Sequence, residues 1–140
     1  MLGKSYMRAS HNLFLKKNIS LNSPTADLGS GEKNDYKKFI FMNKSFVENF
    51  DLYKIKKITK IINLEKKFFL KKKYKNILLF NVLEHVENKD TLIQSINNNL
   101  KKNGKLELFV PFMYRYHGDP KDFYRFTHTF LKNFLKKKWL

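Results

Sequence analysis

Apolar and polar residues along the chain follow two periods, one typical of helices and the other of strands. A weakly amphipathic pattern over residues 5–19 predicts a first helix. The clearest strand is expected at 77–80, in "NILLF", where the continuous apolar run is typical of a strand buried on both faces. The segment "DYKKFIFM" predicts a short helix or turn. Four other short segments predict strands, and they read "TADL", "FVENFDL", "KITKIINL" and "KLELFV".

Two later segments predict helices. In "NKDTLIQSINNNLKKNG" Asn88 is a candidate cap and Gly104 a stop. A final helix is expected from Phe123 to Lys138, and Asp119 and Pro120 are suited to its N-terminus. Its apolar face would consist of Phe126, Phe130, Leu131, Phe134 and Leu135. Because strands and helices alternate, we expect a parallel sheet covered on both faces.

Composition narrows the class of protein. The 140 residues suit one domain, and the absence of cysteine excludes disulfides and thiolate chemistry. No apolar run is long enough for a membrane span, and "NLFL" is too short for a signal peptide, so a cytoplasmic protein is expected. The net charge of +17 is compatible with nucleic-acid binding. Only Arg8, Arg115 and Arg125 are arginine, however, so we favour a lysine-rich background over a nucleic-acid surface.

The stretch "DLGSG" follows the first expected strand of the sheet. Ligands of parallel sheets bind at the carboxyl ends of the strands, where Gly29 and Gly31 would let the backbone approach a ligand closely. A plain tight turn is the alternative. Asp51 ends the second expected strand, 24 residues after Asp27, a position suited to binding a ribose or to a solvated acid.

Two further stretches carry candidate chemistry. Glu84 and His85 in "NVLEHV" are compatible with catalysis or, with Asn81, with a metal site. We favour a role in orienting the next helix and expect no metal. In "VPFMYRYHGDPKDFYRFT", His117 is a candidate general base among aromatic and charged residues, and a capped helix start there is compatible with that role.

In this order, the motifs resemble class I S-adenosylmethionine-dependent methyltransferases of the methyltransferase type 11 family. The resemblance covers about residues 25–135 and includes the acid-x-Gly-x-Gly turn, the acid ending strand two, "NLE", "VLEHV" and "VPF". One subset of the family continues with His-x-x-Pro-x-Asp-Phe/Tyr-x-Arg-Phe/Tyr-Thr, which "HGDPKDFYRFT" matches at every fixed position.

The resemblance implies a Rossmann-like α/β fold, a three-layer αβα sandwich with a mostly parallel sheet of order 3-2-1-4-5. Residues 1–24 would form an N-terminal helix and lead-in, and 25–140 the single methyltransferase domain. S-adenosylmethionine would be the cofactor. The implied cofactor-binding residues are Asp27, Gly29, Gly31, Asp51, Asn63, Leu64 and Asn81, and the substrate loop would use Tyr116, His117, Asp122 and Arg125.

The implied function is methyl transfer to a small-molecule, sugar or lipid-linked acceptor. Departures from the family pattern include Lys33 in place of the third glycine, Asn63 in place of an acid, and Tyr74-Lys75 in place of Phe-Asp. The family's last hairpin is also missing, so strand five is expected to be an exposed edge that favours self-association. An RNA methyltransferase using the lysines and a non-catalytic remnant are the alternatives.

Overall fold

A computed structural model describes residues 6–21, 23–31, 35–42, 47–54, 60–118 and 121–139. Its centre is a five-stranded sheet of order β5-β4-β2-β6-β7, in which all neighbouring strands are parallel. In chain order this is 3-2-1-4-5, which confirms the prediction. The strands are β2 (Thr25–Leu28), β4 (Val47–Asp51), β5 (Lys60–Ile61), β6 (Tyr74–Phe80) and β7 (Leu100–Phe109).

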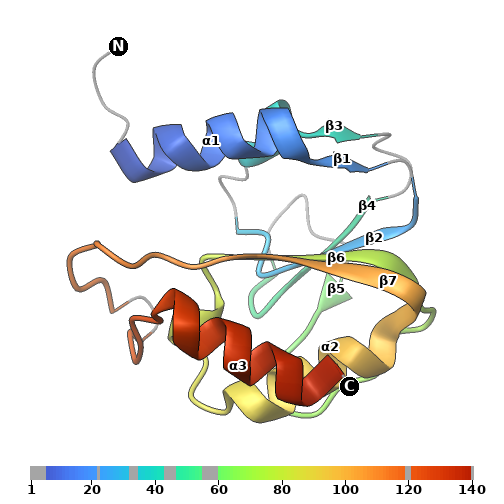
Figure 1. Ribbon diagram of the computed structural model, residues 1–140. Helices are drawn as coiled ribbons and strands as arrows, with labels where there is room; N and C mark the ends of the chain where they lie inside the picture. The colour runs from blue at the N-terminus through green and yellow to red at the C-terminus, as the bar shows by residue number, and fades with distance from the viewer. Residues whose placement is uncertain are drawn as a thin grey trace.

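Helices cover both faces of this sheet, so the expected three layers are present (Figure 1). On one face lies α1 (Tyr6–Asn18), together with the 3-10 helix η1 (Asp35–Phe39). A small parallel pair, β1 (Ser20–Leu21) and β3 (Phe41–Met42), adjoins them. The opposite face is covered by α2 (Lys89–Asn99) and α3 (His128–Trp139).

The interior strand β6, which lies between β2 and β7, supplies core residues on both sides of the sheet. Ile77 and Leu79 belong to the apolar cluster on the side of α2, whereas Leu78 and Phe80 belong to the cluster beneath α1. All four side chains are buried. Successive strand residues point to opposite faces, so a strand covered on both sides must be apolar at every position. This explains the uninterrupted run in "NILLF".

The end of α2 differs from the prediction. Asn88 does cap the helix, since its Oδ1 accepts a hydrogen bond from the Thr91 N–H. The helix ends at Asn99, however, and not near Gly104. The buried Asn99 amide donates to the Phe68 carbonyl at 3.2 Å and accepts from the Leu70 N–H at 2.7 Å. The chain then turns directly into β7, because pairing with β6 competes with further helical turns.

The start of α3 also differs. Residues 121–127 are not helical, and the helix begins at His128 with the Thr127 hydroxyl accepting from the Phe130 N–H at 3.2 Å. Asp119 and Pro120, the predicted N-terminus, lie outside the described residues. The stretch before the helix is held elsewhere, because the Phe123 N–H donates to the carbonyl of Glu84 in the 3-10 helix η3 (Leu83–His85).

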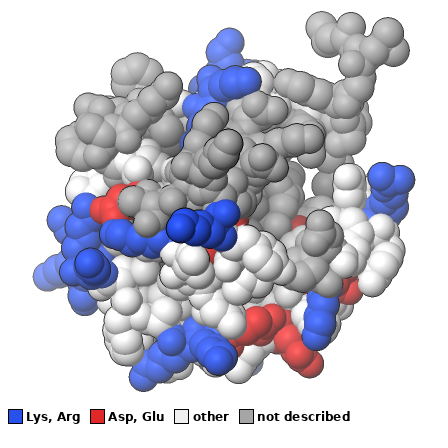
Figure 2. All heavy atoms as spheres, turned by 180° about the vertical axis from the view of Figure 1, so that it is seen from behind, with Lys and Arg blue, Asp and Glu red and all other residues white. Residues whose placement is uncertain are grey.

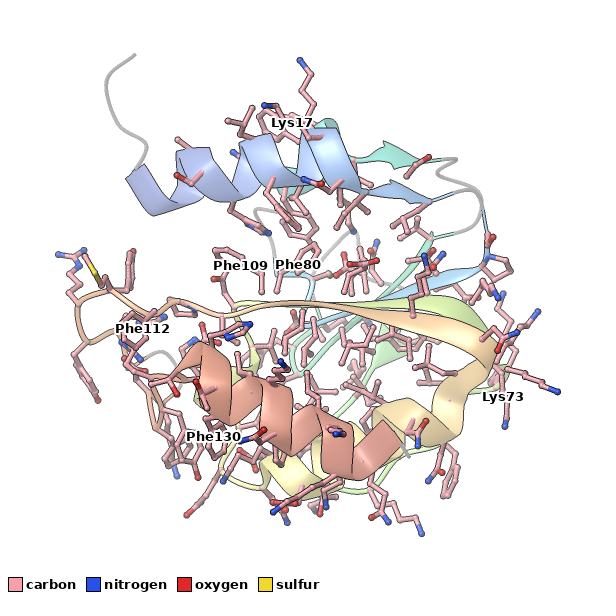
Figure 3. All side chains as sticks on the ribbon, viewed as in Figure 1. Lys17, Lys73, Phe80, Phe109, Phe112 and Phe130 are labelled. Atoms are coloured by element: carbon pink, nitrogen blue, oxygen red, sulfur yellow. The ribbon has the colours of Figure 1, made fainter. Side chains whose placement is uncertain are left out.

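The apolar face of α3 packs on the core as expected. Leu131, Phe134 and Leu135 contact the cluster on the side of α2, and Phe126 is buried there just before the helix begins. Phe130 stacks on the rings of Phe126 and Phe134, both at 5.6 Å between centroids, but remains 42% exposed (Figure 3).

Basic side chains are spread over the molecule. On the face in Figure 2 the described lysines and arginines form several separate groups, with acidic side chains beside some of them. Lys17 and Lys73 point outward from different regions (Figure 3). Glu48 pairs with both Lys60 and Lys72. None of the helices within the described ranges has the length and apolar character needed to cross a membrane.

The outer edge of strand β7 leads us to expect self-association of the protein. The strand pairs with β6 along one side, and among the described residues no strand pairs with its other side. An unpaired strand edge is a template for pairing with a second chain. We expect dimers at micromolar concentration by light scattering, and a larger dimer fraction at higher salt, because the charge of +17 repels a second copy. A monomer across that concentration range at low and high salt would contradict this prediction.

Candidate functional site

A pocket of about 330 Å³ opens at the carboxyl ends of β2, β4 and β6. Because β2 lies between β4 and β6, this is the switch point at which open parallel sheets bind ligands. Its volume suits a small molecule. The lining residues are Gly29, Gly31, Asp51, Leu52, Tyr53, Asn63, Leu64, Glu65, Asn81, Val82, His85 and Val86.

The glycine turn after β2 forms one wall of the pocket. Gly29 and Gly31 both have left-handed backbone conformations, with φ of 71° and 60°. The Gly29 N–H donates to the Phe50 carbonyl at 2.8 Å, which fastens the turn to β4. A side chain at Gly29 would collide with Val82, a neighbouring residue of the pocket lining. Only glycine satisfies both the conformation and the contact.

Asp51 is held in a defined position beside this turn. Its Oδ2 accepts from the Gly31 N–H at 2.9 Å and its Oδ1 from the Leu52 N–H at 2.7 Å. A carboxylate can accept about four hydrogen bonds. Asp51 therefore retains acceptor capacity at the pocket wall for ligand hydroxyls.

Asp27 does not line the pocket, unlike the other predicted cofactor-binding residues. Its carboxylate is buried and is contacted by two side chains of η1. The Tyr36 hydroxyl donates to it at 2.6 Å, and the Lys37 ammonium lies 2.6 Å away. Burial raises the pKa of Asp27, although Lys37 opposes the shift. The motif did not reveal these partners, because their segment reaches Asp27 only through the tertiary fold.

The remaining predicted cofactor residues meet at the pocket. Asn63 and Leu64 follow β5, and Asn81 follows β6. Asn81 has a φ of 54°, unusual for a residue with a side chain, and its N–H donates to the Phe109 carbonyl at 2.8 Å. Six of the seven residues implied by the resemblance thus surround one cavity, while their individual roles remain predictions.

Several lining residues were not singled out from the sequence. Leu52 and Tyr53 directly follow Asp51, and Val82 directly follows Asn81, so their adjacency to predicted residues was the available signal. Glu65 directly follows Leu64 and ends the motif "NLE", so the same signal was available for it. Its carboxylate accepts from the N–H groups of Glu87 and Asn88, at 2.9 and 3.2 Å, and so joins the end of β5 to the start of α2.

His85, which lines the pocket, belongs to a cluster with Glu84 and His117. Glu84 is fully buried, and among the described residues neither of its carboxylate oxygens has a hydrogen-bond partner. Its Oε1 lies 3.8 Å from Nε2 of His85 and 4.0 Å from Nε2 of His117. Burial raises the pKa of Glu84 to about 7. Because Asn88 caps α2, the expected helix-orienting role does not account for the Glu84 side chain.

The loop after β7 is held in shape by Arg125. Its guanidinium forms a two-bond pair with the buried Asp122 carboxylate and donates to the Arg115 carbonyl at 3.2 Å. Hydrogen bonding to Arg125 holds the pKa of Asp122 below its usual value. Asp122 also accepts from the His117 N–H at 2.9 Å. Three of the four predicted loop residues therefore contact one another, whereas Tyr116 is exposed.

The same loop presents apolar surface to solvent. Phe112, Met113 and Tyr116 are 57%, 79% and 77% exposed. Figure 3 shows Phe112 on the part of the loop that extends beyond the sheet. Several large apolar side chains exposed on one loop are typical of a binding surface.

Comparisons with known proteins agree with this geometry. A sequence profile for a family described as a methyltransferase domain matches residues 6–133. No curated protein matches the sequence. Among solved structures, a Bacillus halodurans protein described as a candidate methyltransferase is 14% identical, with a TM-score of 0.64, over 93% of this chain and 67% of its own.

Two other solved structures share the fold over a smaller part. The glycopeptide N-methyltransferase MtfA is 13% identical, with a TM-score of 0.51, over 70% of this chain and 50% of its own. The YcgJ protein of Bacillus subtilis is 14% identical, with a TM-score of 0.50, over 70% and 48%. The chain thus spans about half the length of these two proteins.

Proposed function

Since the chain belongs to the methyltransferase domain family, we propose that it binds S-adenosylmethionine in the pocket beside Gly29 and transfers its methyl group to an acceptor. The observation that carries this proposal is the meeting of Gly29, Gly31, Asp51, Asn63, Leu64 and Asn81 around one cavity. The comparisons support the family, and the cavity supports the cofactor.

The residues at the pocket fit the chemical groups of this cofactor. The carboxylate of Asp51 has acceptor capacity for the two ribose hydroxyls. In the glycine turn, Gly29 packs directly against Val82. At Gly31 no described atom lies within 4 Å of the Cβ position, so a ligand can lie against the backbone there. Asn63 and Leu64 provide an amide and an apolar side chain suited to an adenine ring.

The chain contributes mainly positioning to the reaction. The sulfonium group of the bound cofactor supplies an already activated methyl group, so an acceptor aligned with it needs little further chemistry. Arg125 and Asp122 hold the loop that adjoins the pocket. His117, the predicted general base, does not line the pocket, so we propose no proton transfer through it.

We place the acceptor at the exposed aromatic loop. Phe112, Met113 and Tyr116 offer an apolar surface on which a sugar, a lipid-linked group or another small molecule can pack. The described lysine and arginine side chains on the face in Figure 2 form separate groups, which does not favour a nucleic-acid acceptor. A small-molecule, sugar or lipid-linked acceptor is therefore the class that we propose.

Calorimetric titration with S-adenosylmethionine tests the cofactor assignment. We expect the parent chain to bind one molecule, and Asp51→Ala to bind more weakly by roughly 1.5–3 kcal/mol, about 10–150-fold, because hydrogen bonds to a charged group are lost. Asp51→Asn keeps an oxygen for the Gly31 N–H and should lose less. The matched control is Asp90→Ala, which removes an exposed acid on α2.

The assignment of Asp51 fails if Asp51→Ala and the parent bind equally tightly. The cofactor proposal as a whole fails if the folded parent chain, checked by circular dichroism, binds neither S-adenosylmethionine nor S-adenosylhomocysteine.

A further inference from the structure

Glu84 is a buried acid without an explained partner. It follows β6 in η3, and its side chain is completely inaccessible to solvent. No group in the described part of the chain donates a hydrogen bond to either of its carboxylate oxygens. Burying a carboxylate without a partner is unfavourable, so such groups in folded proteins are paired or coordinate a metal ion.

Two histidines from separate segments turn toward this carboxylate. His85 is its neighbour in the chain, and His117 comes from the loop after β7. Their Nε2 atoms lie 3.8 and 4.0 Å from Oε1 of Glu84. These distances exceed those of direct hydrogen bonds, so neither histidine ring is hydrogen-bonded to the carboxylate.

The other nitrogen of each ring is already occupied. Nδ1 of His85 contacts the Lys121 carbonyl oxygen. Nδ1 of His117 lies 3.2 Å from a carboxylate oxygen of Asp122 and 3.3 Å from the Arg115 carbonyl oxygen. An oxygen acceptor at Nδ1 places the proton there, so both Nε2 atoms carry a lone pair toward Glu84. Metal-ligating histidines have this arrangement, with the second nitrogen donating to a carbonyl or carboxylate.

We propose that Glu84, His85 and His117 bind a divalent transition-metal ion such as Zn²⁺, through one carboxylate oxygen and two imidazole nitrogens. The three ligand atoms lie within 4.8 Å of one another. Bonds of about 2.0–2.2 Å to a common ion require ligand atoms somewhat closer than this, which small side-chain rotations supply. Two nitrogens and one oxygen suit first-row ions, whereas Mg²⁺ and Ca²⁺ prefer ligand sets of oxygen alone.

The site would lie next to the cofactor pocket. His85 lines that pocket, and three protein ligands leave at least one coordination position for water or another ligand. The sequence led us to expect no metal and a general base at His117. The proposed site differs from both expectations, because His117 would be a metal ligand. It does not depend on methyl transfer, because it rests only on the positions of the three side chains.

The test is binding of Zn²⁺ alone to the untagged full chain, first stripped with a chelator. Calorimetry should show one ion bound per chain. Glu84→Gln and His117→Gln should each bind at least tenfold more weakly, because a ligand is lost. The matched control His128→Gln changes an exposed histidine outside the cluster and should bind like the parent. Glu84→Gln is expected to fold, since it removes a buried charge and keeps the side-chain volume.

Two further readouts connect the binding to this site. Saturating Zn²⁺ should raise the Tm of the parent and of His128→Gln, but not that of Glu84→Gln, because only an ion bound to the native state stabilises it. Co²⁺ should give a visible absorption band in the parent that is lost in His117→Gln. Absence of one-to-one Zn²⁺ binding, or equal binding by Glu84→Gln and His128→Gln, would overturn the proposal, whatever the result with S-adenosylmethionine.

Discussion

Gly29→Ala is expected to destabilise the native state by about 2–5 kcal/mol. The φ of 71° at Gly29 is a left-handed conformation, which costs about 1–2 kcal/mol for a residue with a Cβ atom. The added methyl group would also overlap the Val82 side chain, which is stiff because it is β-branched. Overpacking of this kind costs about 1–3 kcal/mol. The same overlap narrows the pocket, so S-adenosylmethionine binding should fall as well.

Gly31→Ala is the matched control for this substitution. Gly31 has a similar φ of 60°, but an added Cβ would meet no atom of the described residues within 4 Å. Only the backbone strain of about 1–2 kcal/mol is expected. Urea unfolding of both variants at constant m-value gives the comparison. Equal losses at the two positions would show that the collision with Val82 does not matter.

Val82→Ala provides a second check on the collision. Combined with Gly29→Ala, it should lose less stability than the sum of the single substitutions, because it removes the atoms that the new methyl group meets. Strict additivity would contradict the proposed overlap.

Acidification from pH 7 to pH 4 is expected to cost the fold up to about 3 kcal/mol through His11. Burial lowers the pKa of this histidine from 6.5 to about 4. Between these values the unfolded chain binds a proton that the native state does not, so stability falls as the pH falls. Well above pH 6.5 the histidine is neutral in both states, and well below pH 4 it is charged in both, so the loss occurs between these limits. A shift of one pKa unit corresponds to about 1.4 kcal/mol.

The surroundings of His11 explain the lowered pKa. Its ring is 5% exposed, stacks on Phe109 at 3.7 Å between centroids and meets the edge of Phe80 at 5.0 Å. Figure 3 shows both phenylalanines between the sheet and α1. Within the described part of the chain Nε2 of His11 has no hydrogen-bond partner, so a charge there would be poorly solvated.

His11→Phe isolates this effect, because it keeps an aromatic ring at the site and cannot bind a proton. The stability of parent and variant, measured by urea unfolding in chelator at several pH values, gives a difference curve. Other titrating groups cancel in that curve, including Glu84, whose raised pKa changes stability in the opposite direction. Parallel pH profiles for the two proteins between pH 4 and 7 would rule out His11 as the cause.

The elements that could be predicted were those with a strong local signal. The apolar run in β6 and the Asn88 cap of α2 depend on neighbouring residues only, and both were confirmed. The predictions of where α2 ends and where α3 begins were wrong, and for the same reason. Asn99 is bound to a distant loop, and Phe123 is bound to Glu84, so contacts between segments decided where each helix stopped or began.

The pocket was predictable because its residues follow directly after strands. Parallel strands bring their carboxyl ends to one edge, so Gly29, Asp51 and Asn81 had to come close once the sheet order was known. The partners of Asp27 were not predictable in this way. Tyr36 and Lys37 reach it from η1, and no periodic pattern places a side chain of that segment over β2.

By itself, the sequence determined the order of strands and helices, the apolar layers and the glycine turn, because these follow from period, from φ preferences and from residues close in the chain. Only the tertiary structure decided that His117, 33 positions after Glu84, turns its Nε2 toward that buried carboxylate. A glutamate or a histidine in a sequence does not show which residue of a distant segment it will contact. Such a meeting depends on how Arg125 and Asp122 shape the loop after β7, and that shape arises from contacts made when the segments pack together.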